Sequence, residues 1–117
     1  MYRSLYDEMA GDTPAGNREQ ERRAFLRSIE LLEAACKSGP ASRDAIDALY
    51  FVNRLWAVLL ADLANDSNDL PESLKAGLIS IGIWVLRRVE DIRSGKSTDF
   101  SALIDVTRTI SGGLSRG

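Results

Sequence analysis

Residues 42–65, SRDAIDALYFVNRLWAVLLADLAN, decide the fold, because their apolar side chains recur with the period of an α-helix. Ser42 offers a hydroxyl that can cap the first turn, and the polar cluster from Asn65 to Asp69 predicts a turn. The segment is therefore predicted to be a helix with one face in a core. The main stripe on that face is Ala45, Ala48, Leu49, Val52, Leu55, Trp56, Leu59 and Leu63.

A helix is predicted before this segment and two more after it. Asp12-Thr13-Pro14 begins the first and Ser38-Gly39-Pro40 ends it, with apolar positions at Phe25, Ile29, Leu32 and Cys36. Pro71 begins the next and Ser94-Gly95 ends it, with a stripe of Leu74, Leu78, Ile81, Val85, Val89 and Ile92. Ser97, Thr98 or Asp99 caps the last and Gly112-Gly113 ends it, with a stripe of Phe100, Leu103, Ile104, Thr107 and Ile110.

No segment alternates with period two, so we predict an all-α fold, an antiparallel helical bundle of four main helices in one domain, residues 1–117. An N-terminal segment, residues 1–12, precedes the bundle, and residues 112–117 are expected to be a frayed tail. In the N-terminal segment, Tyr2, Leu5, Tyr6 and Met9 fall at i, i+3, i+4 and i+7, which predicts a short amphipathic helix.

The composition argues against catalysis, metals, cofactors and membrane insertion. The chain has no histidine and one cysteine, Cys36, which we expect to be buried and inert. Its acidic helix residues lie three or four positions from arginines, which predicts surface ion pairs; they are Glu19, Glu21, Glu30, Glu33, Glu90 and Asp91. No apolar run approaches the ~20 residues of a membrane span, and the first residues lack the apolar core of a signal peptide. We therefore expect a cytoplasmic protein that is not an enzyme.

A second apolar face distinguishes the segments 42–65 and 71–94 from ordinary surface helices. It comprises Phe51, Val58, Ile79, Ile83, Trp84 and Leu86, which lie off the main stripes. One interpretation makes these two helices a central hairpin wrapped by the other two. The other leaves a groove that receives an amphipathic helix of a partner, to which Tyr2, Leu5, Tyr6 and Met9 contribute as well. Gly77 and Gly82 either permit close helix packing or mark a loop between Leu78 and Ile83.

Three blocks resemble the flagellar biosynthesis regulator FlaF family: residues 28–35 (SIELLEAA), 48–56 (ALYFVNRLW) and 70–85 (LPESLKAGLISIGIWV). The similarity extends from about Tyr2 to Ile110. It implies a cytoplasmic protein that promotes flagellin synthesis, secretion and filament assembly, and that binds flagellin as a chaperone. It also implies a functional connection to the partner regulator FlbT.

An alternative is post-transcriptional regulation of the flagellin message, with or against FlbT. The net charge of −2, from 15 basic and 17 acidic residues, argues against direct nucleic-acid binding. Flagellin's terminal segments are amphipathic helices, and a helical protein with surplus apolar surface could cover one. The same surplus could serve a homodimer, so both monomer and homodimer stay open.

Deleting residues 1–10 is predicted to leave the bundle folded and to strengthen flagellin binding. The reason is that an amphipathic segment docked in the groove would have to be displaced by the partner, which lowers the apparent affinity. Calorimetric titration of the full-length and shortened chains measures this. Unchanged affinity would make the segment a bystander, and weaker binding would make it a contact of the partner.

Overall fold

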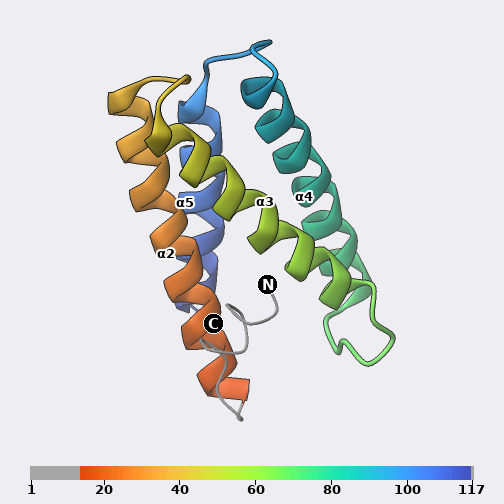
Figure 1. Ribbon diagram of the computed structural model, residues 1–117. Coiled ribbons are helices and arrows are strands. Elements are labelled where there is room, and N and C mark those ends of the chain that lie inside the picture. The colour runs from red at the N-terminus through yellow and green to blue at the C-terminus, as the bar shows by residue number, and fades with distance from the viewer. Residues whose placement is uncertain (1–13, 117) are drawn as a thin grey trace.

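The computed structural model describes residues 14–116, with side chains for residues 19–113, and within that range it has four helices and no strand. They are α2 (Pro14–Ser38), α3 (Arg43–Leu63), α4 (Glu72–Arg93) and α5 (Phe100–Arg116), and successive helices run antiparallel (Figure 1). The prediction of an all-α fold with four main helices is confirmed. The N-terminal helix predicted around Tyr2, Leu5, Tyr6 and Met9 lies outside the described residues.

Local side-chain chemistry fixes where the helices begin and end. The Ser42 hydroxyl oxygen accepts a hydrogen bond from the backbone N–H of Ala45 at 3.1 Å, as expected for an N-cap. Asp99 caps α5 in the same way, since its Oδ1 accepts from the backbone N–H of Ala102 at 3.3 Å. Hydrogen bonds from the Ser101 hydroxyl and from the backbone N–H groups of Ala102 and Ser101 hold the pKa of Asp99 below its usual value. Gly39 and Gly95 follow α2 and α4 with φ of 101° and 85°, the left-handed conformation that ends a helix.

Each helix packs against the next one in the sequence, and α2 also packs along α5. α2 lies between α3 and α5, while α4 packs against α3 and approaches α5 over a small area. Figure 1 shows α4 and α5 close together at their shared loop and far apart at their other ends. The hairpin of α3 and α4 is therefore not wrapped by the other two helices, and the interpretation that made it central is wrong: α4 forms an edge.

The core is centred on Trp56 of α3. The ring of Phe25 from α2 meets the Trp56 ring edge to face, with centroids 5.8 Å apart and planes at 78°. The predicted stripe of α3 is confirmed, with Leu59 only partly buried, and so is that of α5, with Ile110 only partly buried. On α4 the prediction holds for Val85, Val89 and Ile92.

The other half of the α4 stripe is not core. Leu74 is 47% exposed, and Leu78 and Ile81 are only partly buried. The physical reason is the divergence of α4 from α5, which takes the first turns of α4 away from the bundle (Figure 1). Periodicity identified the face correctly, but it does not specify how much of that face a neighbouring helix covers.

On α2 the prediction is confirmed for Phe25 and Leu32 and wrong for Ile29 and Cys36. Cys36 is exposed and Ile29 is half-buried, so the expectation of a buried thiol is wrong. Small side chains replace them in the core, because α2 has a helix on each of two sides and helices approach closest over small residues. The buried positions are Ala24, Phe25, Ser28, Leu32 and Ala35. The Ser28 hydroxyl donates to the Ala24 carbonyl at 3.0 Å, which satisfies it inside the core.

The predicted end of the last helix is also wrong, since α5 continues through Gly112 and Gly113 to Arg116. Neither glycine has a positive φ. A glycine inside a helix costs only about 1 kcal/mol relative to alanine, which a helix packed along its length can absorb.

Gly82 is a point of close contact between α4 and α3. A Cβ at this position would lie 2.8 Å from Trp56 Cε3 and 2.8 Å from Leu60 Cδ2, well inside van der Waals contact. The prediction of close packing is confirmed for Gly82. It is wrong for Gly77, which has nothing within 4 Å of a Cβ, and the alternative of a loop is wrong for both, since α4 is continuous.

Gly82→Ala is expected to destabilise the fold by about 1–3 kcal/mol, because overpacking against Trp56 outweighs the gain in helix propensity. Gly77→Ala is the matched control in the same helix, and it should stabilise by up to ~1 kcal/mol. Urea unfolding of both variants measures this. Equal stabilisation by the two substitutions would contradict the tight α3–α4 contact.

Candidate functional site

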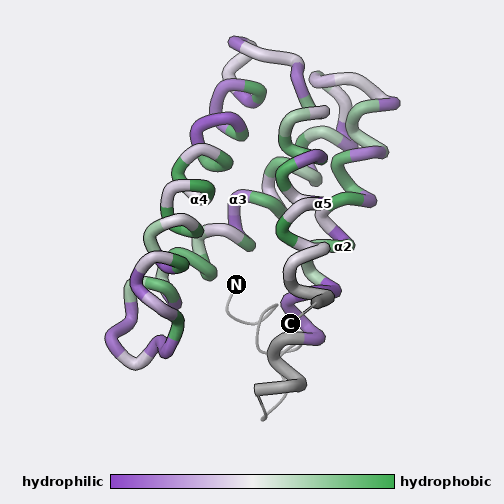
Figure 2. Tube along the Cα trace, turned by 180° about the vertical axis from the view of Figure 1, so that it is seen from behind, coloured by the Kyte–Doolittle hydropathy of each residue, from purple (hydrophilic) through white to green (hydrophobic). Residues whose placement is uncertain are grey.

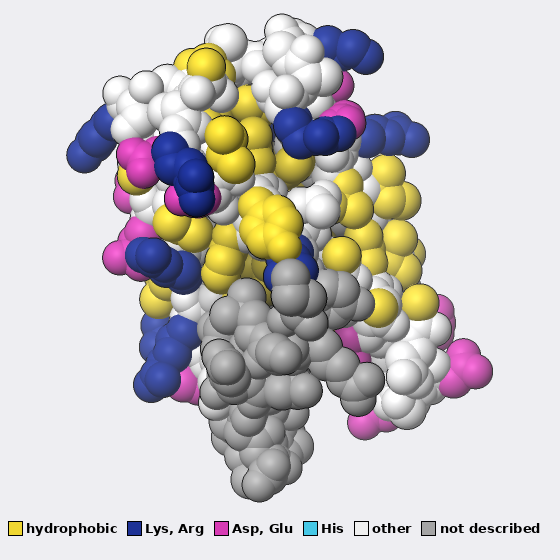
Figure 3. All heavy atoms as spheres, viewed as in Figure 1, with side chains coloured by type: hydrophobic (Ala, Val, Ile, Leu, Met, Phe, Trp, Pro, Cys, Tyr) yellow, Lys and Arg dark blue, Asp and Glu magenta, His cyan; other side chains and the backbone are white. Residues whose placement is uncertain are grey.

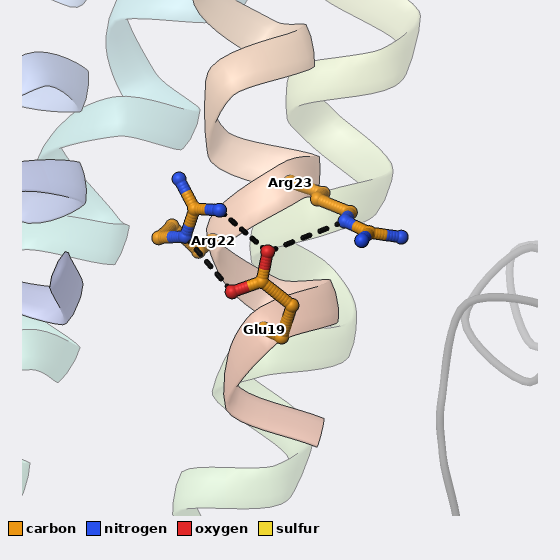
Figure 4. A network of polar contacts seen from close by, with 3 residues as sticks. All are labelled: Glu19, Arg22 and Arg23. Carbon is orange, nitrogen blue, oxygen red and sulfur yellow. Dashed lines mark hydrogen bonds and ion pairs between the residues drawn. The ribbon is translucent and has the colours of Figure 1, made fainter. Parts of the chain in front are cut away.

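The acidic and basic side chains form surface pairs of the kind that the sequence predicted. Glu19 accepts from Arg22 Nε at 3.1 Å and lies 3.4 Å from Arg23 Nε (Figure 4). The hydrogen bond from Arg22 holds the pKa of Glu19 below its usual value, although the carboxylate stays accessible to solvent. Glu33 does not form the predicted pair within its own helix; it pairs with Arg108 and so joins α2 to α5. Among the described residues no group of three His, Cys, Asp or Glu side chains could hold a metal ion.

The hairpin of α3 and α4 carries a second apolar surface, which we call the outer face; one of its members, Leu86, is partly buried and also packs against the core. On α4 its members step by three, four and three residues, the spacing of a helix that packs along another helix. Ile83 at the centre is 44% exposed, and on α3 Ile46 and Tyr50 are 61% and 54% exposed. The outer face comprises Ile46, Tyr50, Ala57 and Ala61 of α3, the C-cap residue Ala64, and Ala76, Ile79, Ile83 and Leu86 of α4.

A groove of about 590 Å³ runs along the outer face at the end where α3 begins and α4 ends. Its floor is apolar and its rim is polar. It is lined by Pro40, Ile46, Leu49, Tyr50, Asn53, Leu86, Val89, Glu90 and Arg93. Two contacts hold basic side chains in place at or beside the rim. Arg93 donates to both carboxylate oxygens of Glu90, at 2.8 and 2.6 Å, and the Arg54 guanidinium carbon lies 4.4 Å from the centre of the Tyr50 ring.

A smaller hollow of about 300 Å³ lies at the opposite end of the hairpin, next to the α3–α4 turn. Its apolar wall is formed by Leu63, Ala64, Ala76 and Ile79, and its polar wall by Asn65, Asp66, Glu72 and Lys75. Figure 2 shows this turn as a hydrophilic segment between the hydrophobic turns of α3 and α4.

The structure brings together three of the six partner-binding residues predicted on these helices. Ile79, Ile83 and Leu86 share the outer face. Trp84 lies beside Arg88, whose guanidinium carbon is 5.4 Å from the indole ring, on a different side of α4. Phe51 and Val58 are partly buried and lie about 100° around α3 from Tyr50 and Ala57.

Sequence reasoning missed Ile46 and passed over Tyr50. The spacing of four residues that joins them was a usable signal, but both lie outside the main stripe of α3.

A further cleft, of about 220 Å³, separates α4 from α5, and it is lined by Ile81, Asp105, Val106, Thr109 and Ile110.

None of the helices α2 to α5 is long and apolar enough to cross a membrane. The model of the family described as "Flagellar protein FlaF" matches residues 2–114, nearly the whole chain. No curated protein and no solved structure matches this chain.

Ile83→Glu is expected to leave the melting temperature within a few degrees of wild type, because the side chain is already 44% exposed. Val85→Glu, two residues away and fully buried, should cost several kcal/mol, since it buries an unpaired charge. Thermal melts followed by circular dichroism compare the two. A collapse of the Ile83→Glu melt would place Ile83 in the core and remove it from the outer face.

Proposed function

Since this chain belongs to the flagellar protein FlaF family, we propose that it is a non-enzymatic flagellar regulator that binds flagellin as a chaperone in the cytoplasm. By covering flagellin before assembly, it would promote flagellin synthesis, secretion and filament formation. The observation that carries the proposal is the outer face, an apolar surface with a groove of about 590 Å³ on a small helical protein. Exposed apolar patches of this kind mark interaction surfaces.

The groove suits an amphipathic helix. An incoming helix can place apolar side chains at i, i+3 and i+7 against the floor formed by Leu49, Leu86 and Val89. Ile83 extends this floor beyond the groove toward the α3–α4 turn. Amphipathic terminal segments of flagellin have the required pattern, and in the cytoplasm they need a cover to stay apart.

The rim supports recognition of a protein rather than of RNA. Arg93 is engaged by Glu90, and Arg54 lies over the Tyr50 ring, so the basic groups at the groove are held by neighbours in the same chain. An RNA-binding surface would instead leave clustered cations free to contact phosphates, and the Tyr50 ring, although 54% exposed, has the Arg54 guanidinium over its face. We therefore place regulation of flagellin production downstream of flagellin binding, with FlbT as a further partner.

Ile83→Glu is expected to weaken flagellin binding at least tenfold, because it places a charge at the centre of an apolar interface. The measurement is calorimetric titration of flagellin into the full chain. Leu26→Glu is the matched control: Leu26 is 40% exposed on α2, away from the outer face, and the same change there should leave the affinity unchanged.

Equal affinities for wild type and Ile83→Glu would contradict the use of the outer face. Absence of binding by the wild-type chain would contradict the chaperone role itself. Binding of flagellin leader RNA in a gel-shift assay, without binding of flagellin, would favour direct action on the message.

A further inference from the structure

The outer face has two chemically different ends. The turn end, residues 61–76, carries four acidic residues and one lysine, a net charge of −3. The opposite end, residues 43–54 and 86–96 without Arg88, which lies beside Trp84 on a different side of α4, carries five basic and four acidic residues, a net charge of +1. In Figure 3 apolar side chains line the right-hand edge, over α4, between basic side chains above and acidic ones at the turn below.

The two ends also differ in side-chain size. Ile46 and Tyr50 are large and protrude at the basic end, where they are 61% and 54% exposed. Ala61, Ala64 and Ala76 make the acidic end low, and the hollow of about 300 Å³ lies there. Large side chains at one end and a hollow at the other make the face complementary to an inverted copy of itself.

We propose that a second copy of this chain covers the outer face in an antiparallel dimer with two-fold symmetry. The axis lies in the plane of the interface, across the helices and near Ala57 and Ile83. This arrangement sets the acidic end of each copy against the basic end of the other. Tyr50, with Arg54 over its ring, enters the hollow of the second copy, and the guanidinium meets the carboxylate of Asp66; Glu72, which also lines the hollow, lies 3.8 Å from Lys75 of its own chain.

Charge excludes the other symmetric arrangement. A two-fold axis along the helices would bring the two turn ends together, each with a net charge of −3, and would set Tyr50 and Ile46 against their own equivalents. Like charges across an interface are costly, and opposed large side chains would hold the alanines apart. The antiparallel arrangement avoids both problems.

The size of the face sets the expected strength of the dimer. A face about 30 Å long, the length of ~20 helical residues, and about two helices wide covers roughly 600 Å² on each copy. That is about 1,200 Å² in total, the lower limit of specific interfaces. The dimer should therefore dissociate in the micromolar range, so that a flagellin helix can replace the second copy. This regulatory consequence rests on the proposed function, whereas the dimer itself does not.

Size-exclusion chromatography with light scattering, on the full chain without flagellin and across the micromolar range, tests the dimer. We expect the mass to rise with concentration toward twice 12.9 kDa, and Ile83→Glu to hold it at one chain. Arg54→Glu and Asp66→Arg should each raise the dissociation constant about tenfold, because two-fold symmetry makes every contact occur twice. The double variant should return to within about twofold of wild type, and Arg23→Glu on α2 should have no effect.

Three results would overturn the proposal. One is a single-chain mass at every concentration. Another is a dimer that Ile83→Glu does not dissociate, which would mean a different interface. The third is a double variant no tighter than the single ones, which would contradict the antiparallel pairing. Flagellin titration is a separate measurement, so flagellin binding by a strictly monomeric chain would retain the proposed function and reject only the dimer.

Discussion

The close approach of Gly82 to the side chains of Trp56 and Leu60 sets how α4 lies against α3. A Cβ at Gly82 would lie 2.8 Å from atoms of both side chains, so α4 can approach α3 this closely only because the residue is glycine. On its other side Trp56 meets Phe25 of α2, with ring centroids 5.8 Å apart. The Trp56 indole ring therefore links α2, α3 and α4. The position of α4 depends on the absence of a Cβ at residue 82.

The close α3–α4 contact has a consequence for the surface. Since α4 packs against α3 and meets α5 over only a small area, two of its sides stay open. One side borders the α4–α5 cleft with Ile81, and the other forms the outer face with Ile79, Ile83 and Leu86. A fold that enclosed α4 would have a larger core and no such surface. The openness of the bundle leaves this surface accessible, and it is where we propose that flagellin and the second copy bind.

Apolar surface exposed in this way is a liability, because any complementary apolar segment can bind it. The segregation of charge along the hairpin restricts which segments can bind to the outer face. Acidic groups gather at the turn and basic groups at the other end, so only a helix or helix pair with the inverse distribution satisfies both. The size difference between the alanine end and the Tyr50 end acts in the same direction. Selectivity would thus arise from the ends of the face, and affinity from its apolar centre.

The sequence by itself determined the four helices, their caps and most of the residues on their buried faces. These features depend on side chains within a few positions of one another: the Ser42 cap, the left-handed Gly39 and Gly95, and the repeat from Ala45 to Leu63. Only the tertiary structure decided which apolar residues are covered. Leu74 and Phe100 look alike in their stripes, yet one is 47% exposed and the other 2%, because coverage depends on the helix that lies alongside. For the same reason periodicity gave no warning that Cys36 is exposed and Ser28 buried, or that Ile46 and Tyr50 join Ile83 in one surface.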